Sequence, residues 1–342
     1  GLLRGGPQSA GASPGPVCYG RSGIEPTFTD AALTMGYLDP VQFLGGEMIL
    51  AADAAEVAVR DKVADPLGLD VISACRGIFE VLLAKTVSAV REITVQEGLD
   101  PREFAMLAFG GAGPMFVPLV GRELGVKEVI VPQAPSVFSA WGMLMTDIVE
   151  EYSQTILTLL DDLNIASLAD ATGQLESQAE GGLADGGFAP EARLIERSAE
   201  MRYFGQEHSL EVSIDGVASL DEVRARFDEA HTRRYGHQMG DPVQLVNIRV
   251  RGIGRETKPE LPEIAQRDGV GPDPTGTRQA YCFAAGGSAP FAVDRRDDLR
   301  AGDVIAGPAI VEEATTTIIF FSDQLANVDK FGQLVISQEA SS

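Results

Sequence analysis

The sequence predicts an α/β domain followed by a β-rich α+β domain, and three observations carry this prediction. First, residues 104–109 form a continuous apolar run, short enough for a strand buried on both faces. Second, this run breaks into a glycine cluster at 110–113, and an amphipathic stretch to residue 124 and a second apolar strand at 128–131 follow. Third, beyond residue 190 the apolar residues alternate with a period of two, as in half-buried strands.

The glycine cluster, Gly110, Gly111, Ala112 and Gly113, is the first candidate for a binding site. A strand that runs through glycines into a helix lets the backbone approach a ligand and presents free helix N–H groups to it. The alternative is a tight turn with close helix–strand packing, and spacing alone does not separate the two. The absence of G-x-x-x-x-G-K-[ST] excludes a Walker-type phosphate loop, and the absence of G-x-G-x-x-G argues against a dinucleotide fold.

Composition and charge exclude several classes of partner. The 342 residues are 44% hydrophobic and 6% aromatic, as expected of a soluble globular protein, and the length suggests two domains. The net charge of −23 argues against nucleic acid or an anionic membrane surface as a partner. No apolar run reaches the roughly 20 residues that span a bilayer, and no signal peptide is visible.

Cysteine and histidine suggest neither a disulfide framework nor a metal site. The 3 cysteines are odd in number and far apart, which fits a reducing cytoplasm. The histidines, His208, His231 and His237, are scattered and show no metal-ligand spacing. His231 lies on the apolar face of a predicted helix at 220–235, so we expect it to be packed rather than to bind a ligand.

The start of the chain leaves two alternatives open. Residues 1–23 are rich in Gly, Pro and Ser, which is typical of a flexible linker, but Cys18, Tyr19 and Arg21 within them favour an ordered loop. Asp30 follows in P-T-F-T-D-A at 26–31. It could cap a helix at 31–37, or act as a catalytic carboxylate that positions water or a metal.

We place a first domain at 1–150, a connecting helix and loop at 151–190 and a β-rich domain at 191–342. In the first domain, amphipathic patterns predict helices at 51–63 and 71–97. In the last, alternation predicts a hairpin within 199–214 and strands at 243–254, 279–283, 304–311, 315–320 and 333–336.

Several longer motifs occur in order along nearly the whole chain. In the first half they are G-P-Q-S-A-G-A-S-P-G-P-V-C-Y-G-R-S-G at 6–23, P-T-F-T-D-A at 26–31 and L-A-F-G-G-A-G-P at 107–114. In the second half they are R-Y-F-G-Q at 202–206, R-Y-G-H at 234–237, L-V-N-I-R-V at 245–250, G-P-A-I-V-E at 307–312 and T-T-T at 315–317. Together they resemble the signatures of the hydantoinase A / 5-oxoprolinase family.

The resemblance implies half of an actin/sugar-kinase-like, ribonuclease-H-like ATPase fold, followed by the β-rich α+β domain. In that fold ATP lies in the cleft between two domains. Gly110, Gly111, Ala112 and Gly113 would hold the adenosine, and the small-residue helix at 139–144 would form part of the interdomain hinge. Family members usually carry two Asp-Gly-Gly-Thr phosphate loops that this chain lacks, and residue 1 is Gly rather than Met. We therefore expect the carboxy-terminal half of a longer protein.

Two positions depart from the family pattern. Phe116 stands where a histidine is common, so we expect no polar contact from it. Ser22 stands where a glycine is frequent.

The resemblance further implies an ATP-dependent hydrolase that opens a hydantoin or 5-oxoproline ring through a phosphorylated amide. ATP and Mg²⁺ would be the cofactors, Asp30 a candidate catalytic residue, and the metal ligands unknown. The implied partners are a hydantoinase B-type subunit, which could dock from about Pro190 onward, the missing amino-terminal half and the cyclic amide. The alternatives are the ATP-using subunit of an acetone or acetophenone carboxylase, and a non-catalytic assembly platform. As it stands, we expect this chain to bind ATP weakly and to hydrolyse nothing.

Overall fold

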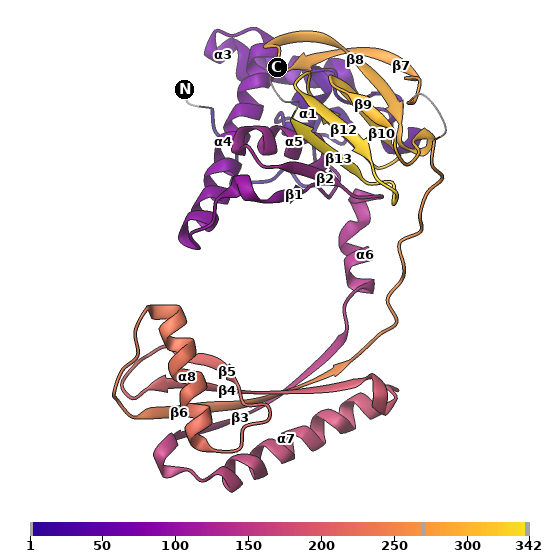
Figure 1. Cartoon of the computed structure of the whole chain (residues 1–342). Helices are drawn as coiled ribbons and strands as arrows, with labels where there is room; N and C mark the ends of the chain where they lie inside the picture. The colour runs from indigo at the N-terminus through magenta and orange to yellow at the C-terminus, as the bar shows by residue number, and fades with distance from the viewer. Residues whose placement is uncertain (1–2, 268–270, 339–342) are drawn as a thin grey trace. The chain divides into compact units, whose positions relative to one another are not determined.

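The computed structural model describes residues 3–267 and 271–338. They form two compact units, Gly1–Trp141 with Glu260–Ser342, and Gly142–Pro259, each of which is described by itself (Figure 1). This division differs from the predicted boundaries, because the strands after residue 260 belong to the first unit. The reason is a non-local strand pair: Leu334–Gln338 (β13) runs antiparallel to Glu128–Val131 (β2), with Leu334 opposite Val131.

Two helices of the first unit, Phe28–Thr34 and Val71–Gln96, begin at side-chain caps. In the longest of them, Asp70 accepts from the backbone N–H of Ser73 at 2.9 Å, and Cys75 and Phe79 belong to its buried stripe. The helices are α1 (Phe28–Thr34), α2 (Ala52–Val59), α3 (Asp65–Leu67), α4 (Val71–Gln96), α5 (Gly113–Leu124) and α6 (Phe138–Leu144), the last of which contains the unit boundary.

A five-stranded sheet in the first unit carries the predicted strand–glycine–helix–strand segment. Ala105–Leu107 (β1) pairs in parallel with β2, and α5 connects them, as the sequence predicted. Gly121 of α5 is required there, because a Cβ at this position would collide with Val129 of β2. The remaining strands are β13, β12 (Gln324–Val328) and β9 (Val304–Ala306), in the order β1-β2-β13-β12-β9.

The expectation of a strand at 104–109 buried on both faces is wrong. Only Ala105–Leu107 is a strand, and Phe104, Leu107 and Phe109 are exposed. The physical reason is the position of β1 at the edge of the sheet, with no strand on its other side in the part of the chain that the structure describes.

The second sheet of this unit has the order β11-β10-β8-β7. Its strands are β7 (Gly276–Cys282), β8 (Gly287–Arg295), β10 (Ala309–Glu313) and β11 (Thr316–Phe320). The predicted single strand at 304–311 is therefore two strands, β9 and β10, in different sheets. Gly307 allows the crossing, because its Cα packs against the Phe321 carbonyl with no room for a Cβ.

Aromatic side chains unite the core of the first unit. Phe79 of α4 lies 4.3 Å from Phe28 of α1 and 5.8 Å from Phe283, measured between ring centroids. Tyr37 is fully buried and donates to the Tyr281 carbonyl at 2.5 Å, which ties the segment after α1 to β7.

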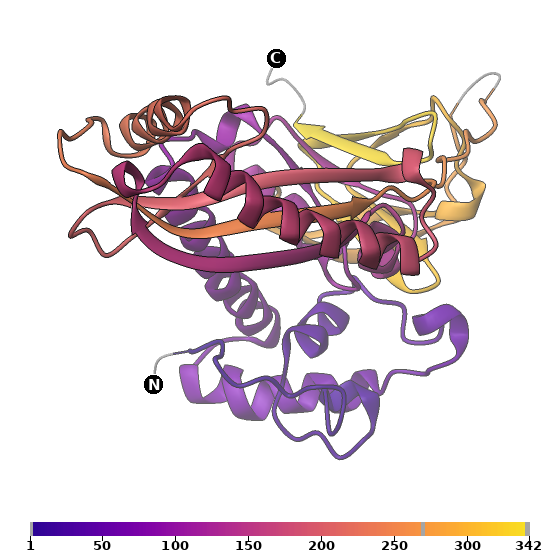
Figure 2. The same ribbon diagram turned by 90° about the horizontal axis from the view of Figure 1, so that it is seen from below.

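The second unit is one antiparallel sheet with helices on one face. The strands β3 (Ile148–Leu159), β4 (Arg193–Tyr203), β5 (Leu210–Ser213) and β6 (Val243–Gly254) follow the order β3-β6-β4-β5. The predicted hairpin is confirmed as the β4–β5 pair, whereas β3 occupies part of the predicted connecting segment 151–190. The buried alternate residues of β4 and β6 form one core with α7 (Ile165–Asp185) and α8 (Leu220–Tyr235), and Figure 2 shows α7 along the strands.

The other face of this sheet carries ion pairs: Arg249 pairs with Glu151 and Glu200, and Arg251 pairs with Glu151. Among the helices of the described residues, none is both long and apolar enough to cross a membrane.

Candidate functional site

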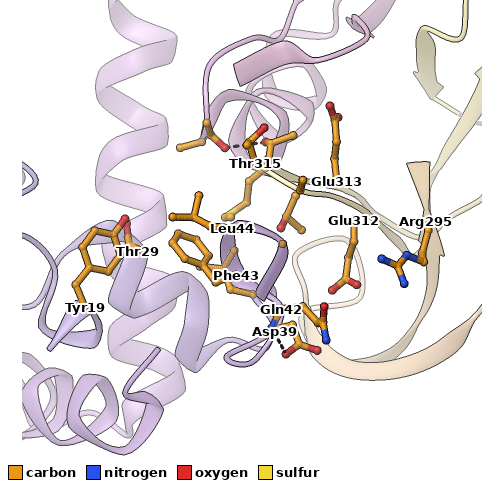
Figure 3. A pocket seen from close by; sticks show the side chains of 18 of the residues that line it. Tyr19, Thr29, Asp39, Gln42, Phe43, Leu44, Arg295, Glu312, Glu313 and Thr315 are labelled. Carbon is orange, nitrogen blue, oxygen red and sulfur yellow. Dashed lines mark hydrogen bonds between the residues drawn. The ribbon is translucent and has the colours of Figure 1, made fainter. Parts of the chain in front are cut away.

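The glycine cluster opens onto a cavity of about 360 Å³ in the first unit. In Figure 3, Phe43 and Leu44 lie between Tyr19 and Thr29 on one side and Glu312, Glu313 and Arg295 on the other. The cavity is lined by Tyr19, Phe28, Thr29, Leu38, Asp39, Gln42, Phe43, Leu44, Gly45, Gly111, Ala112, Met115, Arg295, Asp297, Glu312, Glu313, Ala314, Thr315, Thr316 and Thr317.

The four predicted adenosine-loop residues occupy different places at this cavity. Gly111 and Ala112 line it, whereas Gly110 and Gly113 flank it. Gly110 has a φ of 84° and donates its N–H to the Pro135 carbonyl at 2.7 Å. Gly113 begins α5, and its N-cap Ala112 offers no side-chain acceptor, so the first N–H groups of the helix lack a capping side chain. This helix end is suited to a polar or anionic ligand.

Open space lies above Gly111. A Cβ added there would have only the Thr315 carbonyl oxygen within reach, at 4.0 Å. The sequence left open the alternative that this glycine serves only close packing in a tight turn. The open space at Gly111 does not support that alternative within this unit. We call the backbone surface at Gly111 and Ala112 the cradle. It has room for a ligand, and the cavity volume of about 360 Å³ falls within the usual range for small-molecule pockets.

The T-T-T motif at 315–317 lines the cavity on the side opposite the glycine loop and is hydrogen-bonded to that loop. Thr316 donates its hydroxyl to the Gly111 carbonyl at 2.7 Å. The hydroxyls of Thr315 and Ser136 lie 2.5 Å apart, which joins the β10–β11 turn to the segment before α6. These bonds explain how a motif about 200 residues away in sequence becomes part of the same site.

The polar wall of the cavity is partly neutralised. Arg278 bonds to Asp39 at 3.0 Å and to Glu312 at 2.7 Å, so both carboxylates already have a cationic partner. The 39–45 loop was missed by sequence reasoning. The only sequence feature that could have indicated this loop is the Gly-Gly pair at 45–46. In the structure Gly45 has a φ of 66° and Leu44 a φ of 52°, so the turn is left-handed there.

A half-buried arginine, Arg296, holds the segment that follows β2. Arg296 donates to the carbonyls of Val131 and Pro132, both at 3.2 Å, and of Gly332 at 2.8 Å. Burial lowers the pKa of Arg296, and burial raises the pKa of Glu313 against the opposing charge of Arg296. One carboxylate oxygen of Glu313 is buried and has no hydrogen-bond partner among the described residues. Arg296 holds the segment that leads to Pro135 and hence to Gly110.

Asp30 is fully buried and does not line the cavity. One carboxylate oxygen accepts from the Cys18 N–H at 2.7 Å. The other accepts from the Thr27 N–H and hydroxyl, both at 2.8 Å, and from the Val17 N–H at 3.2 Å. Helix α1 thus begins earlier than predicted, with Thr27 as the N-cap and Asp30 completing the capping box.

These bonds anchor the loop that precedes α1. Cys18 is fully buried, so the ordered-loop alternative is confirmed for this part of the chain. Burial and the charge of Asp30 raise the pKa of the Cys18 thiol, which keeps it protonated and unreactive. Ser22 has a φ of 67°, a conformation that favours glycine. Phe116 packs against Phe28 at 5.5 Å and adds no polar group to the site, as expected.

The three histidines, although scattered in sequence, line one cavity of about 240 Å³ in the second unit. His231 is 1% exposed, and Tyr203 and Tyr235 pack against its ring, so the prediction of a packed histidine is confirmed. Its Nδ1 lies 2.8 Å from the His237 carbonyl oxygen and is therefore the protonated nitrogen. Over residues 3–267 and 271–338, no group of His, Cys, Asp or Glu side chains is arranged to hold a metal ion.

Comparison with known proteins gives matches along the chain. A family model described as hydantoinase/oxoprolinase matches residues 1–152, and one described as hydantoinase/oxoprolinase C-terminal domain matches residues 162–338. Caprolactamase subunit alpha of Pseudomonas jessenii is 38% identical over 93% of this chain and 47% of its own length.

Two solved structures share the fold. The ATP-dependent caprolactamase from Pseudomonas jessenii matches with a TM-score of 0.80 and 34% identity, over 98% of this chain and 50% of that one. A nucleotide-free acetone carboxylase, from work on ATP-dependent acetone carboxylation, matches with a TM-score of 0.83 and 26% identity, over 97% of this chain and 49% of that one. The predicted fold class is confirmed: a mixed α/β structure whose neighbours are consistent with an actin-like ATPase-type fold.

The chain spans about half the length of these relatives. The two family models cover most of its residues, in the order that the motifs predicted. The chain belongs to the hydantoinase/oxoprolinase family.

Proposed function

We propose that this chain is the carboxy-terminal part of an ATP-dependent hydrolase of cyclic amides and supplies the adenosine side of its nucleotide site. The observation that carries the proposal is the open cradle at Gly111, a family-motif glycine whose missing side chain leaves space in the cavity rather than a packing contact. The relatives called ATP-dependent caprolactamase and ATP-dependent acetone carboxylase support the choice of nucleotide.

In this proposal the chain binds and orients the nucleotide. Gly111 and Ala112 let the backbone approach it, and the first N–H groups of α5 face its polar atoms. Phe43 and Leu44 offer apolar surface for a base, while Thr316 fixes the Gly111 carbonyl. When bound, ATP supplies the phosphoryl group that turns a poorly electrophilic amide carbonyl into one that water attacks.

Mg²⁺ belongs to the proposal for the complete enzyme. The described residues contain no preformed cluster of metal ligands, and the cavity carboxylates Asp39 and Glu312 are already bonded to Arg278. We infer that the phosphates and the half of the enzyme absent from this chain hold the metal. A hydantoinase B-type subunit is a further proposed partner, and the buried free cysteines favour a cytoplasmic location.

Asp30 is proposed as a positioning residue rather than a group that touches substrate. Its four hydrogen bonds hold the loop that carries Tyr19, which lines the cavity. A catalytic role would require the carboxylate to leave these donors.

The second candidate is the ATP-using subunit of a ketone carboxylase, which the TM-score of 0.83 to acetone carboxylase favours. The test is ATP hydrolysis by the complete enzyme, assayed with hydantoin, 5-oxoproline and caprolactam, and separately with acetone or acetophenone plus bicarbonate. Stimulation by a cyclic amide supports the hydrolase, and stimulation by a ketone supports the carboxylase. If no assembly that contains this chain hydrolyses ATP or needs it for activity, the chain is a non-catalytic assembly platform.

A further inference from the structure

The cavity of about 240 Å³ in the second unit is bounded by two motifs that the proposed function leaves without a role. Gln206 belongs to the R-Y-F-G-Q motif, and Tyr235 and His237 belong to the R-Y-G-H motif. A glycine in each motif turns the chain: Gly205 has a φ of 92°, and Gly236, which ends α8, has a φ of 81°. These turns bring side chains from the end of β4 and the end of α8 to one cavity.

One nitrogen of the His231 ring is committed and the other is available. Nδ1 donates to the His237 carbonyl at 2.8 Å, so Nε2 of the neutral ring is a hydrogen-bond acceptor. Nε2 lies 3.4 Å from the amide nitrogen of Gln206, which also contacts the Met239 sulfur at 3.5 Å. The first distance is long for a hydrogen bond, and the Gln206 carbonyl oxygen accepts none from the described residues. A ligand can therefore take over these groups without breaking a strong bond.

The surrounding contacts hold the acceptor nitrogen in place. Tyr203 donates its hydroxyl to Asp228 at 2.7 Å and accepts from the Met239 N–H at 3.0 Å, which joins β4, α8 and the segment after α8. The ring centroids of Tyr203 and Tyr235 lie 4.8 Å and 4.6 Å from that of His231. The buried imidazole is thus fixed in orientation before any ligand arrives.

The lining of this cavity favours a neutral ligand that carries an N–H group. Lysine and arginine are absent from the lining, so no permanent positive charge attracts an anion. The Nδ1 atom of His237 lies 3.1 Å from the Tyr235 carbonyl, so its Nε2 is a second acceptor. The Gln206 amide is a donor beside the His231 acceptor. A ligand in which N–H adjoins C=O can bond to both at once.

We propose that this cavity binds a small molecule with an N–H–C=O edge, as in a lactam or a cyclic ureide. The ligand N–H donates to His231 Nε2, and the ligand carbonyl accepts from the Gln206 amide. Tyr235, which is 46% exposed, offers its ring as an apolar wall. A metal ion is the weaker occupant, because no group of three His, Cys, Asp or Glu ligands is in position among the described residues.

The proposed function names the same class of molecule as substrate. Assigning the cavity to the substrate rests on that function, whereas the binding itself does not.

Nuclear magnetic resonance of the histidine rings tests the binding directly. The 342-residue chain contains 3 histidines, so isotopic labelling of histidine nitrogen gives one set of ring signals for each. Caprolactam should shift the Nε2 signal of His231 saturably, with a dissociation constant on the order of 1 mM. N-methylcaprolactam lacks the N–H, and protonated azepane replaces the amide by a cation, so both should bind at least about tenfold more weakly. No shift of His231 by caprolactam, equal binding of the N-methyl compound or tighter binding of azepane would overturn the proposal.

Substitution of Gln206 provides the second measurement. Gln206→Ala removes the donor and should weaken caprolactam binding by about tenfold. Gln238→Ala, at an exposed glutamine that does not line the cavity, is the matched control and should bind as the parent does. The Nδ1 signal of His231, which depends on the bond to the His237 carbonyl, reports whether each variant keeps the fold. A folded Gln206→Ala chain with unchanged affinity would refute the assignment.

ATP hydrolysis by the complete enzyme separates this site from the proposed function. Caprolactam binding at His231 without stimulation of ATP hydrolysis by any cyclic amide would count against the proposed function and leave the site in place. Stimulation by caprolactam without a shift of His231 would count against the site alone.

Discussion

Replacement of Gly111 tests whether this glycine makes room for a ligand or only allows close packing in a turn. The φ of Gly111 lies outside the left-handed region, and an added Cβ meets nothing closer than the Thr315 carbonyl at 4.0 Å. Gly111→Ala should therefore leave the folded chain unstrained. It should even raise the free energy of unfolding by about 0.4–1 kcal/mol, because the unfolded chain loses conformational freedom.

The same side chain should obstruct the ligand. Extra methyl groups in a filled site cost about 1–3 kcal/mol, and each 1.4 kcal/mol is tenfold in affinity. We expect Gly111→Ala to weaken ATP binding to the complete enzyme by roughly tenfold, and Gly111→Val by about 100-fold or more. Isothermal titration measures the affinity, and urea unfolding of the same variants measures the stability.

The control is Gly181→Val, at a glycine of α7 whose added Cβ also meets open space. It should change ATP affinity by less than about twofold. Unchanged ATP affinity in a folded Gly111→Val enzyme would refute the cradle. A large loss of stability in Gly111→Ala would instead show that the position is closely packed, contrary to the structure.

Three further predictions follow from neighbouring groups. Asp30→Asn keeps one acceptor but turns an N–H pair toward backbone donors, so urea unfolding should show a loss of about 2–3 kcal/mol, and retained stability with lost activity would restore a catalytic role. Thr316→Val removes the hydroxyl that donates to the Gly111 carbonyl and should lower ATP affinity by about threefold to tenfold in titration. Thr232→Val, which removes a hydroxyl bonded to the Asp228 carbonyl away from the cavity, should not. Because the pKa of Glu313 is raised above the ordinary 4.5, its contribution to stability is full below that pH and is lost as the pH rises through the raised value. The difference in unfolding free energy between Glu313→Gln and the parent should therefore grow from pH 4 to pH 7, and a constant difference would contradict this.

Local patterns predicted the secondary-structure elements that carry the continuous part of the candidate site. The run from 104 to 131 combined an apolar strand, glycines and an amphipathic helix, and the structure has β1, the loop, α5 and β2 there. The same patterns could not show that the opposite wall comes from Thr315 and Thr316, because strand pairing across about 200 residues leaves no periodic signal.

Where the sequence reading failed, non-local contacts decided the outcome. The strand expected at 304–311 divides at Gly307. This glycine packs against the Phe321 carbonyl, a contact between distant residues that the sequence does not reveal. For Asp30 the sequence favoured a cap over catalysis but could not exclude the catalytic role, since either role is compatible with a carboxylate at the start of a helix. Its four donors, two of them from Val17 and Cys18, could be counted only once the preceding loop was in place.

The glycine loop is held from two sides by the described residues: Pro135 accepts from Gly110, and Thr316 bonds Gly111. Because these bonds hold the loop in place before nucleotide binds, less disorder remains to be removed on binding. This is why loss of the Thr316 hydroxyl should lower ATP affinity.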